Sequence, residues 1–197
     1  YLYQKREWNP GLENAFAPAL CNRIDRNTGG IVIAAKNAEA LRVVNEKIRG
    51  HEIRKSYLCV TVGTPSPAQG RIEGFLLKDE AKKLVSFYRR PVPGGKTAAT
   101  LYRTLESRGG LALVECELLT GRTHQIRVSM AEIGHPLLGD GKYGDGAVNR
   151  SYGETRQALY SYQLTFAFTT GAGILDYLKN RSFEVSEVPF REKYFSA

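Results

Sequence analysis

The chain has 197 residues, and its 28 Lys and Arg residues against 20 Asp and Glu residues give a formal net charge of +8. At about 100 to 200 residues per domain, this length fits one domain with a substantial core, which excludes a disulfide-stapled miniprotein. Because 42% of the residues are hydrophobic and 24% are charged, the composition also excludes a disordered tail and a coiled coil.

The first notable feature along the chain is a carboxylate with two guanidinium groups beside it, formed by Arg23, Asp25 and Arg26. Two neighbouring positive charges favour the ionised form of Asp25, which suits a nucleophile better than a general acid. Gly29 and Gly30 follow, and glycines allow a close approach of the backbone or a positive φ. An ordinary Asp-Arg turn explains the same residues, so local composition leaves both interpretations open.

Two strands and one helix are predicted next. Short β-branched runs bounded by turn residues predict strands at residues 31–35 and 57–62. Between them, Asn37 can cap a helix that Gly50 ends. The apolar positions of this helix recur at helical spacing, at Leu41, Val44 and Ile48. Tyr57 opens the second strand and fits either a half-buried anchor or a side chain that stacks on a base.

Residues 111–119 alternate in character, which predicts a third strand. One of its sides is wholly apolar and is expected to face the core. That side consists of Ala112, Val114, Cys116 and Leu118. A second helix is predicted from about Thr123 to Gly134, with an apolar stripe formed by Ile126, Met130 and Ile133. Strands combined with few helices predict an α+β domain.

Arg122, His124 and Arg127 follow the third strand, where the chain turns into the second helix. Such a junction exposes backbone N–H groups and brings the three side chains near one another. It is therefore a candidate receptor for a phosphate or a carboxylate, although His124 also fits a purely structural histidine. The glycine-punctuated loop at residues 134–144 lacks the spacing of a phosphate-binding loop, so no nucleotide cofactor is predicted.

Hydropathy and cysteine usage bear on the compartment. No apolar run approaches the roughly 20 residues that cross a bilayer, and residues 1–7 hold no signal-peptide core. Three cysteines without a Cys-x-x-Cys motif are typical of a reducing compartment. We therefore expect a soluble, cytoplasmic protein that does not attach to a membrane. The three histidines lack the spacing of a metal site, so no metal is predicted.

A sequence pI near 9.4 favours a polyanionic partner such as RNA, because Lys and Arg gain affinity by releasing the counterions of phosphates. A basic but merely solvated surface explains the same charge.

Taken in order, these segments resemble the RluA-type pseudouridine synthases, which isomerise uridine in RNA. Residues 22–36 resemble the family's His-Arg-Leu-Asp-x-x-Thr-Ser-Gly motif and the strand that follows it. Residues 55–57 resemble its Lys-x-Tyr segment, and residues 120–140 are similar to its longest signature, which ends in Gly-His-Pro and Gly-Asp. Residues 158–162 resemble its closing Ala-Leu-His-Ala strand.

The resemblance implies three catalytic residues. Asp25 is implied to be the catalytic aspartate. Tyr57 is implied to pack on the flipped base and to take part in proton transfer, and Arg127 to pair with the catalytic carboxylate. The carboxylate has three open routes: attack on C1′, attack on the pyrimidine ring, or assistance to a glycal-like intermediate.

The resemblance also implies residues that meet the RNA. Arg23 is implied to help fill the place that the base leaves in the RNA stack. Arg26 is expected to bind RNA as well. Arg122, His124 and Gln125 are expected to contact RNA or to shape the pocket.

The sequence departs from the family pattern at several positions, namely Asn22, Ile24, Gly29, Ser129 and Met130. We expect these departures to change target preference more than chemistry, because Arg23, Asp25 and Thr28 remain. The family's leading Lys-Pro-x-Gly segment and an S4-like RNA-binding domain are not found before Tyr1. Residues 1–197 are therefore expected to be a catalytic domain whose N-terminal part is missing.

Together these observations predict an α+β pseudouridine synthase core, with a mixed, mainly antiparallel curved sheet, flanking helices and a central cleft. We expect a monomer that isomerises uridine in rRNA or tRNA without a cofactor, since the reaction needs neither redox chemistry nor phosphate energy. Two alternatives are a catalytically silent RNA-binding domain of the same fold and a carboxylate-based glycosidic hydrolase. For the hydrolase, Asp140 is the candidate for the second carboxyl group.

Overall fold

The structure is a computed structural model that describes residues 4–6, 9, 11 and 16–196. In this part of the chain, seven strands of the main sheet follow the order β10-β9-β4-β8-β7-β5-β6, and β2 pairs with β9 beside them. A small second sheet joins β1 and β3. The pairing of β2 with β9 is parallel and the other described pairings are antiparallel. The predicted mixed, mainly antiparallel sheet is confirmed.

The strands are β1 (Ala19–Leu20), β2 (Gly29–Gly30), β3 (Ala34–Ala35), β4 (Ile53–Val62), β5 (Gln69–Asp79), β6 (Leu84–Tyr88), β7 (Lys96–Arg108), β8 (Leu111–Leu118), β9 (Leu159–Phe166) and β10 (Ser182–Glu184). The helices are α1 (Ala38–Arg49), α2 (Gln125–Glu132), α3 (Gly146–Ser151), the 3₁₀ helix η1 (Gly173–Leu178) and α4 (Pro189–Phe195).

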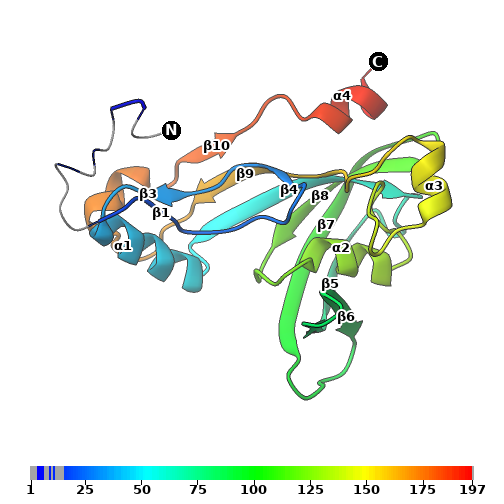
Figure 1. Ribbon diagram of the computed structural model, residues 1–197, viewed down its shortest axis with the longest axis horizontal. Helices are drawn as coiled ribbons and strands as arrows, with labels where there is room; N and C mark the ends of the chain where they lie inside the picture. Colours follow the sequence, from blue (N-terminus) through cyan, green and yellow to red (C-terminus); the bar gives the residue numbers. More distant parts are fainter. Residues whose placement is uncertain (1–3, 7–8, 10, 12–15, 197) are drawn as a thin grey trace.

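Figure 1 shows the sheet running the length of the molecule, with helices gathered toward its two ends. β1, β3, α1 and η1 lie together at one end, which we call the α1 end. α2 and α3 lie toward the opposite end. β5, β6 and part of β7 project from the body as an arm.

The first predicted helix is confirmed by α1. The Asn37 side chain accepts a hydrogen bond from the Ala40 N–H at 2.8 Å, and Gly50 follows the last helical residue. Val44 is buried, and Leu41 and Ile48 pack against the same apolar cluster. This cluster joins α1 to the end of the sheet and fixes the α1 end on β4 and β9.

The prediction of one strand at residues 31–35 is wrong, because the hydrogen bonds of this segment go to different partners. The N–H of Ile31 donates to the Ser161 carbonyl of β9, whereas the N–H of Ile33 donates to the side chain of Asn22. Ladder pairing is limited to β2 and β3. The predicted strand at residues 57–62 is confirmed but starts earlier, at Ile53.

The predicted third strand is confirmed as β8, which ends one residue earlier, at Leu118. Its apolar side packs as expected against Ile126 and Met130 of α2. The opposite side is also buried in its first half, because Leu111 and Leu113 pack against Val188 and the C-terminal helix α4. The sheet therefore has apolar layers on both faces at this point.

The second predicted helix is confirmed as α2, with a later start. α2 begins at Gln125, later than predicted, because His124 adopts a left-handed conformation with φ of 53°. Cys59 and Cys116, far apart in sequence, lie with their sulfur atoms 3.9 Å apart on neighbouring strands, and both are free thiols.

None of the helices in the described residues has both the length and the hydrophobicity that a membrane span needs.

Candidate active site

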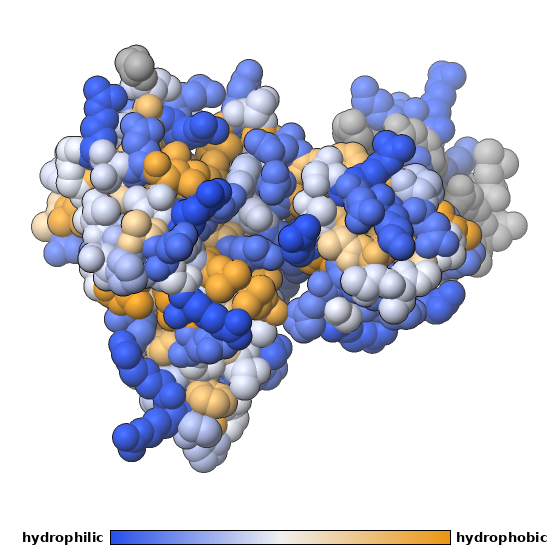
Figure 2. Space-filling model, turned by 180° about the vertical axis from the view of Figure 1, so that it is seen from behind, coloured by the Kyte–Doolittle hydropathy of each residue, from blue (hydrophilic) through white to orange (hydrophobic). Residues whose placement is uncertain are grey.

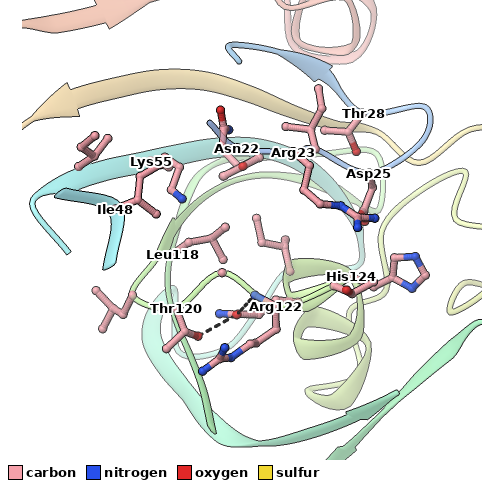
Figure 3. A pocket seen from close by; sticks show the side chains of 18 of the residues that line it. Asn22, Arg23, Asp25, Thr28, Ile48, Lys55, Leu118, Thr120, Arg122 and His124 are labelled. Atoms are coloured by element: carbon pink, nitrogen blue, oxygen red, sulfur yellow. Dashed lines mark hydrogen bonds between the residues drawn. The ribbon is translucent and has the colours of Figure 1, made fainter. Parts of the chain in front are cut away.

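A cavity of about 560 Å³ lies where the loop of residues 21–28 meets the start of α2. Its walls come from that loop, the end of α1, β4, and the segment at residues 118–126. Figure 2 shows the surface hollowed between the α1 end and the rest of the molecule. In Figure 3, Asp25 and His124 lie on one side of the cavity and Ile48 and Lys55 on the other. The predicted central cleft is therefore present.

Glycine allows the loop that carries Asp25 to press against the sheet. Gly30 has φ of 111°, and a Cβ atom there would lie 2.1 Å from the Ser161 carbonyl oxygen of β9. The N–H of Thr28 donates to the Asp25 carbonyl at 3.0 Å, which closes the turn. Gln157, which sequence reasoning missed, donates from its side chain to the Arg26 carbonyl and to the Thr28 hydroxyl. The predicted close backbone approach is confirmed at Gly30.

Asp25 faces the cavity, and the charged group against it is Arg127. The Asp25 Oδ2 atom lies 3.4 Å from Nη1 of Arg127, and the Asp25 side chain is 17% exposed. Neither Arg23 nor Arg26 forms an ion pair with Asp25 among the described residues. The two arginines that flank Asp25 in sequence were therefore the wrong partners, because the turn separates neighbours in sequence and the fold brings α2 beneath the loop.

Arg127 is itself held by Asp140. Its Nε and Nη2 atoms donate to the two carboxylate oxygens of Asp140 at 2.7 and 2.8 Å. The Asp140 side chain is fully buried, and it also accepts from the backbone N–H groups of Lys142 and Tyr143. Arg127, one of the three side chains of the candidate receptor, thus binds carboxylates of its own chain, and its Nη1 group faces Asp25.

Burial and pairing act in opposite directions on this ion pair. Burial disfavours the charged guanidinium of Arg127, but Asp140 and Asp25 outweigh this effect and raise its pKa. Burial likewise disfavours the charged carboxylate of Asp140, whereas Arg127 and the N–H groups of Lys142 and Tyr143 lower its pKa overall. Both groups therefore stay charged at neutral pH.

Tyr57 lies in the wall of the cavity at an irregularity of the sheet. Opposite it, the register with β9 shifts between Ser56 and Tyr57, so Tyr57 pairs with Ser161. Such irregularities are frequent next to active sites because they redirect a side chain. Burial raises the pKa of the Tyr57 hydroxyl, the charge of Asp25 raises it further, and the Ser161 hydroxyl opposes this shift. The phenol is thus protonated at neutral pH.

The His124 ring contacts Tyr143, which lies in the glycine-punctuated loop at residues 134–144. The Tyr143 hydroxyl accepts from the Val85 N–H at 2.9 Å and lies 2.8 Å from Nδ1 of His124. While it accepts from the Val85 N–H, the hydroxyl can donate its own proton to Nδ1, and this arrangement predicts that the neutral ring carries its proton on Nε2. Burial lowers the pKa of His124, in agreement with a neutral ring.

Gln125 shapes the pocket through hydrogen bonds within the protein. Its Oε1 accepts from the Thr120 hydroxyl and the Arg122 N–H, and its Nε2 donates to the Ala99 carbonyl and the Thr100 hydroxyl. An amide has two donors and two acceptor positions, so these four bonds use its full capacity. Of the two expected roles of Gln125, the geometry supports the structural one.

The remaining predicted RNA-binding residues fall into two groups. Arg23 and Arg122 are exposed and line the cavity, and the Nε atom of Arg122 donates to the Thr97 carbonyl. Arg26 is exposed but does not line the cavity, and its carbonyl helps to fix the loop. The described residues contain no group of three His, Cys, Asp or Glu side chains that would hold a metal ion.

The sequence analysis assigned no role to two cations of the cavity, Arg49 at the end of α1 and Lys55 in β4. For Lys55 a signal was present, since residues two apart in a strand share a face and Tyr57 was already a candidate. Asp140 was weighed only as a hydrolase carboxyl group. Its pairing with Arg127 joins residues of different segments, and local spacing gives no measure of that distance.

Comparisons with known proteins identify the family of this chain. The model of the RNA pseudouridylate synthase family matches residues 2–132, a range that holds Asp25, Tyr57 and Arg127. Ribosomal large subunit pseudouridine synthase D of Zymomonas mobilis is 35% identical over 165 residues, which cover 79% of this chain and 50% of that protein. Ribosomal large subunit pseudouridine synthase C of Vibrio cholerae is 35% identical over 150 residues, which cover 75% of this chain and 46% of that protein.

The chain spans about a third to a half of the length of the curated relatives it matches. Among solved structures, human RNA pseudouridylate synthase domain containing 1 has a TM-score of 0.72 at 22% identity, over 90% of this chain and 71% of that one. Human RNA pseudouridylate synthase domain containing 4 has a TM-score of 0.71 at 24% identity, over 92% and 76%. These likenesses support the pseudouridine synthase fold, and the family match covers most of the chain. The chain therefore belongs to the RNA pseudouridylate synthase family.

Proposed function

We propose that this chain isomerises uridine to pseudouridine in RNA, with Asp25 as the catalytic carboxylate. The observation that carries the proposal is the arrangement of Asp25, Arg127 and Asp140. Asp25 reaches the cavity, while Arg127 lies behind it and is fixed by a buried carboxylate. A positioned, charged donor of this kind holds the reacting oxygen atoms in place and stabilises their negative charge without reorganisation.

The reaction exchanges one glycosidic bond for another. The N1–C1′ bond of uridine breaks, the uracil turns over, and a C5–C1′ bond forms, while C5 loses a proton and N1 gains one. Asp25 acts in this sequence by attack on C1′, by attack on the ring, or by proton abstraction that leads to a glycal. Because Tyr57 holds its proton at neutral pH, it meets the base as a neutral phenol and hydrogen-bond donor.

The cavity suits a base that has left its stack. Its volume of about 560 Å³ lies within the usual range of small-molecule pockets. A stacked uridine is out of reach of the carboxylate, so the nucleotide must be flipped out of the RNA. Arg23 and Arg122, exposed beside the cavity, are placed to contact the RNA around it.

For the substrate, we propose ribosomal RNA as the first class to test, because several relatives are named ribosomal large subunit pseudouridine synthases. Transfer RNA is the second. We propose that residues 1–197 act as one catalytic domain, since the sheet and its apolar clusters connect the described residues at both ends.

The hydrolase alternative lacks its second carboxylate. Asp140 is fully buried and bound to Arg127, so it has no access to a water molecule in the cavity. Among the described residues that line the cavity, Asp25 is the carboxylate present. A glycosidic hydrolase of the two-carboxylate type needs a partner about 5 to 10 Å away, and that geometry favours the isomerase.

The test compares Asp25→Asn with the unchanged protein on total ribosomal and transfer RNA. Carbodiimide labelling followed by primer arrest reads the conversion of uridine. We expect Asp25→Asn to abolish conversion while RNA affinity stays within a few fold. Asp79→Asn serves as the control, because Asp79 is exposed and does not line the cavity. RNA binding without conversion by the unchanged protein would support a silent binding domain, and free uracil would support a hydrolase.

A further inference from the structure

Lys55 is a cation directed into the cavity from an apolar wall. It lies in β4 two residues before Tyr57, and Ile53, Lys55 and Tyr57 all line the cavity. Figure 3 shows its amine extending into the cavity in the region between Ile48 and Leu118. The Lys55 side chain is half-buried, and this burial lowers the pKa of its amine.

Among the described residues, Lys55 has neither a carboxylate at ion-pair distance nor a hydrogen-bond acceptor for its amine. Lys47 shows how this chain treats a structural lysine. The Lys47 amine is fully buried, but it pairs with Glu52 at 3.1 Å and donates to the Thr170 carbonyl at 3.0 Å. A half-buried ammonium group without such partners is only partly hydrated, which costs free energy in the unliganded protein. Its placement is therefore explained best by an anion that arrives with the substrate.

The rest of the cavity has the same excess of positive charge. Arg23, Arg49 and Arg122 also line it, whereas Asp25 is already paired with Arg127. Lys binds phosphate as a compact point charge. A neutral uracil offers carbonyl groups but no anionic group, and the anionic parts of an RNA chain are its phosphodiesters.

We propose that Lys55, on the wall opposite Asp25, forms the subsite for a phosphodiester group adjacent to the flipped nucleotide. The proposal rests on RNA as the substrate of the proposed function and adds the part of the RNA that this wall binds. It assigns the two walls different tasks. Asp25 and Tyr57 meet the nucleoside, while Lys55 holds the backbone beside it and so fixes the depth to which the nucleotide enters.

The first test measures RNA affinity against salt concentration for Lys55→Met, Lys55→Arg and the unchanged protein. Loss of one phosphate contact should weaken binding about tenfold and reduce the slope of log affinity against log salt by about one. Lys55→Arg should retain most of the affinity. Lys55→Met should also raise the melting temperature, because it removes a poorly solvated charge. A residue with only a structural role would lower stability and affinity together.

Lys179→Met is the matched control, since Lys179 does not line the cavity. It should leave the affinity within about twofold and the slope within about half a unit. The second test replaces the phosphate on either side of the target uridine with a neutral methylphosphonate. At the linkage that Lys55 binds, this replacement should lower the RNA affinity of the unchanged protein. It should not lower the affinity of Lys55→Met any further.

The phosphate subsite would be overturned if the losses of affinity from Lys55→Met and from the methylphosphonate were additive at both linkages. An unchanged salt slope in Lys55→Met would overturn it as well. These results would leave the proposed function standing wherever the unchanged protein still converts uridine. Absence of both RNA binding and conversion by the unchanged protein would instead overturn the proposed function, and the subsite with it.

Discussion

Arg127 and Asp140 form a two-point contact in which both carboxylate oxygens of Asp140 accept from the guanidinium group, at 2.7 and 2.8 Å. This contact fixes the plane of the guanidinium group and leaves Nη1 at 3.4 Å from Asp25. The Tyr143 ring also contacts this guanidinium group, because its centroid lies 5.3 Å from the central carbon of Arg127. Asp140 is thus a positioning residue that acts on Asp25 through Arg127.

Asp140→Asn should destabilise the protein strongly, because it leaves the buried guanidinium of Arg127 with one carboxylate partner, Asp25, instead of two. Removal of one member of a buried pair typically costs about 3–5 kcal/mol in the free energy of unfolding. Urea denaturation measures this loss. The control is Glu73→Gln, which breaks the exposed pair with Arg71 and should cost at most about 1 kcal/mol. Equal losses in the two variants would contradict the buried role of Asp140.

Tyr143→Phe should remove the group that fixes the His124 ring. The Val85 N–H would lose its acceptor, at a cost of about 1–3 kcal/mol. ¹⁵N NMR should show the Nε2–H form of His124 in the unchanged protein and a mixture of the Nδ1–H and Nε2–H forms in the variant. His135 is an internal control, because its Nδ1 lies 3.2 Å from the Val62 carbonyl and must carry the proton there. The Nδ1–H form of His124 in the unchanged protein would refute the assignment.

The pKa of His124 predicts an acid-dependent loss of stability. Burial lowers this pKa, Asp25 and Asp140 raise it, and Arg127 and Lys142 lower it, with a net decrease. As pH falls below the unfolded value of about 6.5, the unfolded chain takes up the proton first. The contribution of His124 to stability is therefore complete above about pH 6.5 and is lost as the pH falls toward the folded pKa.

The measurement compares unfolding free energies at about pH 7.5 and about pH 5.5. Between these values the unchanged protein should lose more stability than His124→Asn, which has no group to titrate at this position. Acid effects on carboxylates remote from His124 are common to both proteins and cancel in the comparison. If both proteins lost the same amount, the His124 ring would not be responsible for the loss.

Gly30→Ala should disrupt the loop that carries Asp25. The added Cβ atom would lie 2.1 Å from the Ser161 carbonyl oxygen, at a backbone φ of 111°. We expect a loss of more than about 3 kcal/mol in the free energy of unfolding, or no folded protein. Gly171→Ala is the matched control, because its Cβ atom would meet nothing within 4 Å, and it should change stability by at most about 1 kcal/mol. A tolerated Gly30→Ala would show that the loop can move away from β9.

The local predictions that succeeded depend on neighbours in sequence. The cap at Asn37, the end of α1 at Gly50 and the apolar side of β8 follow from hydrogen bonds and periodicities that span a few residues. The single strand predicted at residues 31–35 is wrong because the N–H groups of Ile31 and Ile33 have partners in different segments, β9 and Asn22. A run of β-branched residues indicates an extended chain but does not specify what it pairs with.

By itself, the sequence determined the family, the fold class and the residues on which the chemistry is proposed to rest, Asp25, Tyr57 and Arg127. Only the tertiary structure decided their partners: Arg127 rather than Arg23 or Arg26 beside Asp25, Asp140 behind Arg127, and Lys55 on the opposite wall. Motifs record residue types at fixed spacing along the chain. Ion pairing and desolvation depend on distances and burial that arise when segments about 100 residues apart pack together.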